Sequence, residues 1–257
     1  MKVIGVDAAT WGIIKPHRDE LPNFDRLMEE CDYKTLTVDE KPKSAAVWTS
    51  IFTGKSQAEH GHQDFIVDDE LQRRSDIDAE FVWERLDDRM DVRVLQVPAV
   101  APPLNWNTDY EPEGFGLSSD PEELEQDMDQ LLEKSKQVLE DDPDLFAVVF
   151  MQLDRISHFY WGEDIVLDFY RKMDDALGEL LEYYDFESDE PLIVLSDHGF
   201  AEHGEGRVQT LPEETPKGEI KGDHHEDAVL MVNNLDIGEF HDPEDVGRKI
   251  LDRFGQS

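Results

Sequence analysis

Short apolar runs alternate along this chain with segments in which apolar residues recur every three or four positions. The runs are rich in Val, Ile and Leu and are bounded by polar or proline-containing segments, a pattern typical of buried strands. They lie at Lys2–Val6, Val92–Val97, Leu145–Leu153, Leu192–Leu195 and Val229–Val232. The helical patterns between them cover Phe24–Glu30, Ala45–Thr53, Phe81–Leu86, Pro121–Leu139 and Ile165–Tyr183. This alternation predicts an α/β fold, a three-layer α/β/α sandwich with a largely parallel central sheet.

Two stretches of the chain follow neither periodicity. Residues Pro98–Ser119 and Ala201–Gly222 are therefore expected to be irregular, and both are placed to border a cleft. We expect a single catalytic domain over residues 1–257, with only a short insertion near 201–222.

The charge of the chain is strongly acidic. It has 24 Lys and Arg against 62 Asp and Glu, a formal net charge of -38, while 39% of its residues are hydrophobic. A folded protein with this self-repulsion is expected in a halophilic cytoplasm, because ~1 M salt screens charges beyond about 3 Å. The absence of a basic stripe argues against a stable nucleic-acid complex.

Cysteine content and hydropathy narrow the class of protein further. Cys31 is the only cysteine, which excludes an intramolecular disulfide and a cysteine zinc cluster. The apolar run after Met1 is too short for a signal peptide, and no stretch approaches the ~18 to 20 apolar residues of a membrane span. A soluble cytoplasmic protein without a membrane partner is expected.

Three aspartates follow predicted strands. Asp7, Asp154 and Asp197 come after the runs that begin at Lys2, Leu145 and Leu192, and His158 and His198 accompany two of them. Because the carboxyl ends of parallel strands meet at one sheet edge, we expect these side chains to share a crevice. Each Asp alone would be read as a helix N-cap, and His158 alone as an ordinary helix histidine.

Clustered carboxylates repel one another unless cations lie between them. Aspartate with histidine is a ligand set suited to zinc or manganese, so the group predicts bound metal. Ser44 stands where an extended Pro42 segment gives way to a helix. There, backbone amides and the positive end of the helix dipole stabilise anionic phosphate, although local evidence by itself favours an N-cap role for Ser44.

These motifs resemble, in their order, the alkaline phosphatase superfamily and most closely its type I phosphodiesterase and nucleotide pyrophosphatase branch. The resemblance runs through most of the chain and is carried by "VIGVDAATW" from Val3, "LPNFDRLMEE" from Leu21, "WTSIFTGKSQAEHG" from Trp48, "VPAVAPP" from Val97, "DRISHFYW" from Asp154, "YRKMDDALGELL" from Tyr170 and "SDHGF" from Ser196.

The resemblance implies an alkaline phosphatase-like fold and two divalent metal ions, zinc first and manganese as the alternative. One ion would be held by Asp154, His158 and the histidine of a GxH motif, which is His224, with His225 as its rival. The other ion would be held by Asp7, Asp197, His198 and the oxygen of the nucleophile Ser44.

The implied function is a phosphodiesterase or nucleotide pyrophosphatase that acts on a small-molecule phosphate ester through a covalent phosphoserine. This branch usually has threonine at the nucleophile, and "KSAA" at Lys43 is similar to the serine motif of alkaline phosphatases. A phosphomonoesterase or phosphotransferase is therefore the first alternative, with Lys43, Arg155 and Arg207 as candidate cations for a terminal phosphate. A noncatalytic, metal-stabilised binding protein is the second.

Three further expectations concern the surroundings of the site. Asn107 is a candidate contact to a substrate oxygen, whereas His60 and His62 are expected to be structural. Because only 25 residues separate His198 from His224, no large cap is expected and the site should be comparatively open. The substrate's leaving group and the oligomeric state are left open.

Overall fold

The centre of the molecule is a seven-stranded sheet. The computed structural model describes residues 1–86, 88–111 and 118–256, and its strand order is β2-β13-β8-β1-β7-β5-β6. The central strands β8 (Leu192–Leu195), β1 (Lys2–Val6), β7 (Leu145–Phe150) and β5 (Val92–Val97) are parallel. The outer strands β13 (Asp227–Asn233), β2 (Asp32–Thr37) and β6 (Leu104–Trp106) are antiparallel to their neighbours.

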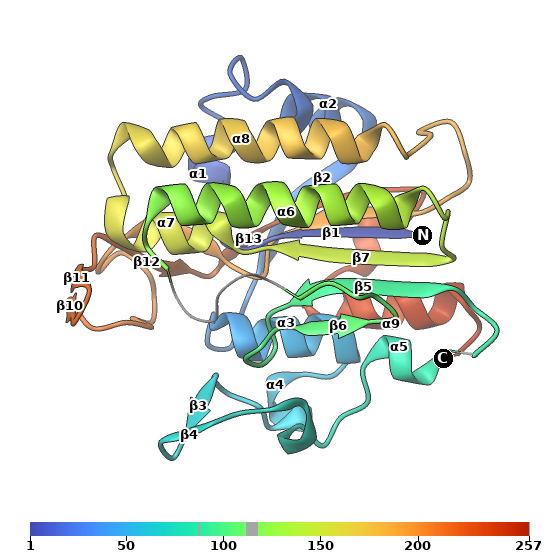
Figure 1. The fold of residues 1–257 in the computed structure, drawn as a ribbon, viewed down its shortest axis with the longest axis horizontal. Coiled ribbons are helices and arrows are strands. Elements are labelled where there is room, and N and C mark those ends of the chain that lie inside the picture. Colours follow the sequence, from blue (N-terminus) through green and yellow to red (C-terminus); the bar gives the residue numbers. More distant parts are fainter. Residues whose placement is uncertain (87, 112–117, 257) are drawn as a thin grey trace.

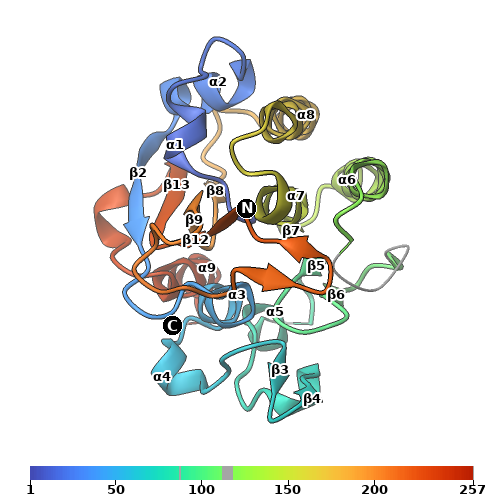
Figure 2. The same cartoon turned by 90° about the vertical axis from the view of Figure 1, so that its left-hand side faces the viewer.

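Helices cover both faces of this sheet (Figures 1 and 2). One face carries α1 (Trp11–Ile14), α2 (Pro22–Glu30), α6 (Pro121–Leu139), α7 (Gln152–Tyr160) and α8 (Asp164–Leu181). The other carries α3 (Ser44–Thr53), α5 (Val82–Arg85) and α9 (Glu244–Arg253), with α4 (Gln57–His60) beside α3. The predicted three-layer α/β/α class is confirmed.

The sheet divides the core into two halves because successive side chains of a strand point to opposite faces. In β1, Val3 packs in the half next to α3, whereas Ile4 and Val6 pack in the half next to α8. All residues of β1, β7 and β8 are buried, as expected of parallel strands with helices on both faces.

One close approach ties α3 to the middle of the sheet. A Cβ on Gly5 of β1 would lie only 2.5 Å from the Trp48 ring of α3. The glycine therefore lets the indole lie directly against the strand, and the Trp48 Nε1–H donates to Asp7 Oδ2 at 3.0 Å. This contact links α3 to the end of β1.

A second contact, between α8 and the start of α2, explains two of the sequence motifs. Asp174 of α8 is buried, and its carboxylate accepts hydrogen bonds from the backbone N–H of Asn23 and of Phe24, at 3.0 and 2.8 Å. These are orphan donors in the first turn of α2. The motif at Leu21 and the motif at Tyr170 therefore act together as an architectural joint.

Two element predictions need correction, and a third gains a direction. The run expected as a strand over Leu145–Leu153 leaves the sheet after Phe150, and α7 begins at Gln152, so that Asp154 lies in the first turn of a helix. The helix expected over Phe81–Leu86 is the shorter α5. The run at Val229–Val232 lies in β13, which is antiparallel to β8.

The two segments expected to be irregular contain short strands. The first contains β6, and its residues 112–117 lie outside the described part of the chain. In the second, β9 (Gly199–Glu202) pairs with β12 (Gly222–His225), and β10 (Glu214–Thr215) with β11 (Gly218–Glu219). A further hairpin comprises β3 (Ile66–Val67) and β4 (Glu70–Leu71), and short 3-10 helices cover Arg74–Asp76 and Ile237–Glu239.

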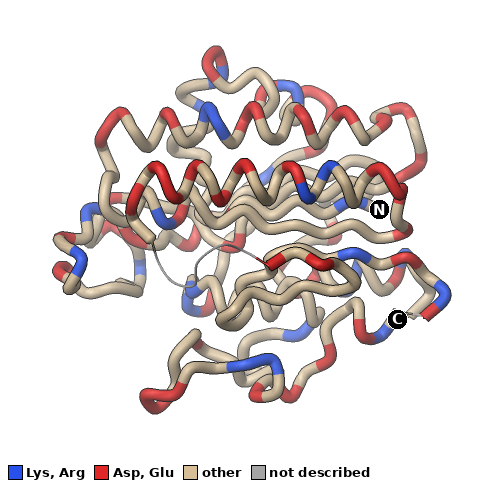
Figure 3. Tube along the Cα trace, in the orientation of Figure 1, with Lys and Arg blue, Asp and Glu red and all other residues tan. Residues whose placement is uncertain are grey.

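The acidic residues lie along the outer sides of the helices and in the loops (Figure 3). The two longest helices, α6 and α8, carry repeated Asp and Glu at exposed positions, whereas their buried sides are apolar apart from Ser135 and Asp174. Within the described ranges, every helix is too short or too polar to cross a lipid bilayer.

Candidate metal centre and active site

The carboxyl edge of the sheet gathers the predicted acidic residues. Asp7 follows β1 directly, Asp197 and His198 follow β8 after one residue, and Asp154 follows β7 in the first turn of α7. These positions are close in space because β8, β1 and β7 are adjacent parallel strands that end at the same edge. All four side chains are buried.

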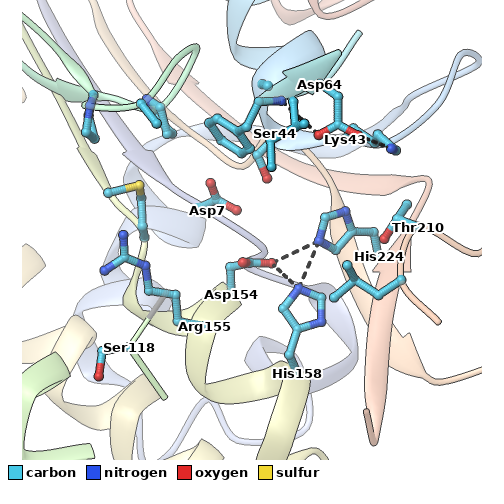
Figure 4. Close-up of a pocket in the computed structure, with 18 of the residues that line it drawn as sticks. Asp7, Lys43, Ser44, Asp64, Ser118, Asp154, Arg155, His158, Thr210 and His224 are labelled. Carbon is cyan, nitrogen blue, oxygen red and sulfur yellow. Dashed lines mark hydrogen bonds and ion pairs between the residues drawn. The ribbon is translucent and has the colours of Figure 1, made fainter. Parts of the chain in front are cut away.

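The first ligand group consists of Asp154, His158 and His224 (Figure 4). Asp154 and His158 are four residues apart on α7, which places them on one side of the helix. Asp154 Oδ1 lies 3.3 Å from His158 Nε2 and 3.1 Å from His224 Nε2, and the two nitrogens are 3.2 Å apart.

The second ligand group contains Asp7, Asp154 and His198, whose ligand atoms lie within 4.8 Å of one another. His198 Nε2 is 3.5 Å from Asp7 Oδ1 and 3.2 Å from Asp197 Oδ2. The structure thus brings together all six predicted Asp and His ligands. Asp154 lies within reach of both groups. The family resemblance had implied that it belongs only to the group with His158 and His224.

The hydrogen bonds of the three imidazoles define which nitrogen is free to bind a cation. His158 Nδ1 lies 3.0 Å from the Gly222 carbonyl, His198 Nδ1 2.9 Å from the Gly199 carbonyl, and His224 Nδ1 2.5 Å from the Pro42 carbonyl. A carbonyl oxygen only accepts, so each Nδ1 carries the proton and each neutral ring has its lone pair on Nε2. This is the arrangement of histidines that ligate metals.

Three carboxylate oxygens in the site have no hydrogen-bond donor among the described residues: Asp7 Oδ1, Asp154 Oδ1 and Asp197 Oδ2. All three are buried, and the nitrogens nearest to them are the Nε2 lone pairs of His158, His198 and His224. Buried anionic oxygens that face lone pairs are strongly unfavourable unless a cation lies between them. The residues present therefore fit divalent metal ions.

The pKa values of two of the aspartates indicate excess negative charge. Burial, together with Asp197 and Asp154, raises the pKa of Asp7 well above its ordinary value. Burial and Asp154 raise the pKa of Asp197 to about 8. Burial opposes ionisation of Asp154 too, but His158 and His224 in their protonated forms hold its pKa well below the ordinary value. Burial lowers the pKa of His198, which favours the neutral ring that a cation requires.

Ser44 is the first residue of α3, and Lys43 is the N-cap residue. The Ser44 side chain is therefore not a helix cap. Its Oγ lies 3.2 Å from His198 Nε2, and in Figure 4 it points toward Asp7. A phosphoryl group beside Ser44 would meet the amide end of α3, where the helix dipole favours negative charge.

His224 reaches the site because β13 runs antiparallel to β8. The amino end of β13 therefore lies beside the carboxyl end of β8, and β12, which carries His224, comes just before it. Neighbouring residues of β12 point to opposite sides. His224 is buried at the site, whereas His225 is partly exposed and accepts the Asp227 N–H at 3.2 Å, so the rival ligand faces away.

A cavity of about 700 Å³ opens from the ligand groups. Most of the described residues that line it come from the first turn of α3, the β3–β4 hairpin, the β5–β6 turn, α7 and the segment between β9 and β12, and α6 adds Asp127. Both segments that were expected to border a cleft do so. The segment around Thr210 and the β3–β4 hairpin add walls to a site that was expected to be open.

The other candidate residues have protein partners. Lys43 forms an ion pair with Asp64, and Arg155 forms one with Asp127 at 3.5 Å. The Arg207 guanidinium donates to the carbonyls of residues 38–40 and is not among the residues that line the cavity.

Asn107 needs correction as a substrate contact. Its side chain donates to the Val92 carbonyl at 3.2 Å, at the amino end of β5. The site lies at the carboxyl ends of the strands, so Asn107 is at the wrong edge of the sheet.

The sequence analysis did not identify several residues that shape the site. Trp48 fixes Asp7, and Asp64 and Asp127 neutralise cations of the cavity. Asp223 accepts the backbone N–H of Thr210 and of His224, at 2.8 and 2.9 Å, and so joins the cavity wall to a ligand. No local signal marks these roles, because most of the partners are distant in sequence.

The fold and the site together define an α/β protein with two groups of candidate metal ligands at the carboxyl edge of its sheet. The model of the family "Type I phosphodiesterase / nucleotide pyrophosphatase" matches residues 2–245. The chain belongs to this family, within the alkaline phosphatase superfamily. No curated protein matches the chain at a significant level.

Solved structures share its fold. Phosphonoacetate hydrolase from Sinorhizobium meliloti 1021 in complex with phosphonoformate has a TM-score of 0.58 at 14% identity, over 79% of this chain and 56% of that one. The complex of the same enzyme with phosphonoacetate has a TM-score of 0.59 at 14% identity, over 79% and 57%. The chain thus spans little more than half the length of these proteins, and the likeness concerns the fold alone.

Proposed function

We propose that this protein is a metal-dependent phosphodiesterase with Ser44 as its nucleophile. The observation that carries the proposal is the set of three imidazoles whose Nε2 lone pairs face carboxylate oxygens without donors, next to a serine at a helix start. Family membership over residues 2–245 supports the same class of reaction.

Two divalent cations would complete this site. One would be held by Asp154, His158 and His224, and the other by Asp7, Asp197, His198 and the oxygen of Ser44. Mixed imidazole and carboxylate ligands suit zinc first and manganese as the alternative. When bound, such ions supply Lewis-acid polarisation of a phosphoryl oxygen and lower the pKa of a coordinated hydroxyl.

Ser44 would carry the covalent step. Its Oγ forms a bond to phosphorus while the bond from phosphorus to the leaving alcohol breaks; the serine proton passes to solvent and the alcohol oxygen takes one up. Water then attacks the phosphoserine, its oxygen remains on phosphorus, and the Oγ regains a proton. The first turn of α3 stabilises the charge on the phosphoryl group throughout.

The engaged cations favour a diester over a monoester. A phosphate monoester carries one more negative charge and is typically held by additional cationic side chains. Lys43 and Arg155 are paired with aspartates, and Arg207 is engaged with backbone carbonyls. A phosphomonoesterase or a phosphotransferase, which would use the same serine, therefore has less support.

A comparison of two chromogenic substrates tests the proposal. We expect bis(4-nitrophenyl) phosphate to be hydrolysed with a higher kcat/KM than 4-nitrophenyl phosphate, in molar potassium chloride with Zn²⁺ or Mn²⁺. A clear monoester preference would overturn the diester assignment. Metal analysis of protein purified without chelator is expected to give two ions per chain. Fewer ions together with no esterase activity would point instead to a noncatalytic binding protein.

A further inference from the structure

The walls of the cavity differ in character from its floor. The floor holds the two ligand groups and Ser44. The walls above it are largely apolar and come from four separate parts of the chain, with Phe65, Ile66, Val100, Phe159, Leu211 and Pro216 among them. Ligand pockets of this kind bury apolar groups and use a few polar atoms for orientation.

The β3–β4 hairpin at the rim carries unusual exposure. Three large hydrophobic residues are exposed in the described part of the chain, and two of them, Ile66 at 59% and Val67 at 37%, form β3. Ile66 lines the cavity. In a protein surface dominated by carboxylates, an apolar side chain held at the mouth of a cavity indicates a partner that covers it.

Two of the cations of the wall form ion pairs with aspartates. Lys43 is paired with Asp64, Arg155 with Asp127, and Lys217 is also engaged in an interaction. The carboxylates of these pairs lie in the wall themselves. A substrate with further phosphates, such as a nucleoside polyphosphate, would bring its additional charge next to Asp64 and Asp127.

We propose that the substrate is a phosphate diester with a single negative charge and a large apolar ester group, alkyl or aryl, which occupies the cavity between the β3–β4 hairpin and the segment around Leu211. This inference rests on the proposed function, since the diester is the group that Ser44 attacks. It goes further by naming the ester group and by excluding polyphosphates as preferred substrates.

A series of substrates with one leaving group tests the inference. Methyl, butyl and octyl 4-nitrophenyl phosphate carry the same charge and release the same 4-nitrophenol, so only the apolar chain changes. We expect kcat/KM to rise by about tenfold or more from methyl to octyl, because each buried methylene strengthens binding. Phenyl 4-nitrophenyl phosphate tests the aryl form, and the 4-nitrophenyl ester of thymidine 5′-monophosphate and adenosine triphosphate test the nucleotides.

Two neighbouring positions of β3 provide a matched pair of variants. Ile66→Ser is expected to reduce the octyl-to-methyl ratio of kcat/KM at least about threefold, because it removes apolar surface from the cavity. Val67→Ser changes an exposed residue of the same strand that does not line the cavity, and is expected to leave the ratio unchanged. Both positions are exposed, so both variants are expected to fold.

The outcomes separate the inference from the function beneath it. A flat series with measurable hydrolysis of the methyl ester, or a nucleotide that is turned over faster than the octyl ester, would overturn the inference and leave the phosphodiesterase intact. No hydrolysis of any diester would overturn the proposed function. Equal effects of Ile66→Ser and Val67→Ser would contradict the assignment of the hairpin.

Discussion

The helix α3 brings two buried serines against two histidines, with opposite consequences. At its start, Ser44 Oγ lies 3.2 Å from His198 Nε2. In its second half, Ser50 Oγ lies 2.9 Å from His60 Nε2. By residue type and distance the two pairs are nearly the same.

The Ser50–His60 pair belongs to a closed network, in which protein groups satisfy the hydrogen bonds of both side chains. The backbone N–H of His62 donates to His60 Nδ1 at 3.1 Å, so His60 carries its proton on Nε2 and donates it to Ser50 Oγ. Ser50 in turn donates to the Ala46 carbonyl at 3.3 Å, and His62 Nε2 bonds to the Ala99 carbonyl at 2.7 Å. In this network of His60, Ser50 and His62, each donor therefore meets an acceptor within the protein.

The Ser44–His198 pair, by contrast, lies next to acceptors that have no donor among the described residues. His198 donates from Nδ1 to a carbonyl, and its Nε2 lone pair faces Asp7 and Asp197, whose nearest oxygens have no donor. A serine beside a buried histidine is therefore not what distinguishes the candidate site; its unmatched lone pairs are. The expectation that His60 and His62 are structural agrees with the closed network.

The largest expected effect is on turnover. Ser44→Ala removes the proposed nucleophile and should lower kcat/KM for a phosphate diester by at least about 1,000-fold. Ser50→Ala makes the same change in the same helix outside the site, and should keep kcat/KM within about twofold of the original. Retained activity in Ser44→Ala would rule out the covalent route, and bound metal in that variant would show that the centre is intact.

The second effect is on metal. His158→Ala removes one Nε2 from the group around Asp154, so we expect metal content to fall and activity to drop by about 10-fold to 100-fold or more. His60→Ala removes a histidine that is equally buried and should retain the full metal content. Elemental analysis of both proteins, purified in parallel, makes the measurement; equal metal content would argue against the first ligand group.

The third effect is on stability. His60→Ala leaves Ser50 and the His62 N–H without partners in a buried environment, which should lower the free energy of unfolding by about 1 to 3 kcal/mol. Unfolding by guanidinium chloride at constant ionic strength measures the loss. An unchanged free energy of unfolding would mean that the closed network does not hold α3 in place.

The smallest effect is on pH dependence. Burial, with His62, lowers the pKa of His60 from the ordinary 6.5 to about 4. Between these values the unfolded chain binds a proton that the folded protein does not, so this group makes the protein less stable as pH falls from 6.5 to 4. In metal-free protein, the unfolding free energy of His60→Gln should decline less steeply over this range than that of the unchanged protein. Parallel pH profiles would show that His60 does not contribute.

Much of the fold could be predicted because its signals are local. A buried run such as Leu192–Leu195 next to an aspartate reveals a strand end within a few residues, and β1 and β8 lie where the pattern placed them. The prediction was wrong at Leu145–Leu153, since a short apolar segment has no period that separates a strand from the first turn of a buried helix. The helix α7 nevertheless brings Asp154 and His158 to one side, as their spacing of four requires.

The amino-acid sequence was sufficient to predict the fold class and the chemical types of the candidate ligands, because buried runs, helical periods and strand-end aspartates are properties of neighbouring residues. Which lone pairs remain unmatched depends on the tertiary structure. The antiparallel course of β13 brings His224 to the edge where β8 ends, and the carbonyls of Pro42, Gly199 and Gly222 direct three Nε2 atoms toward the carboxylates. These contacts join residues that are mostly distant in sequence, and packing of the whole sheet was needed to form them.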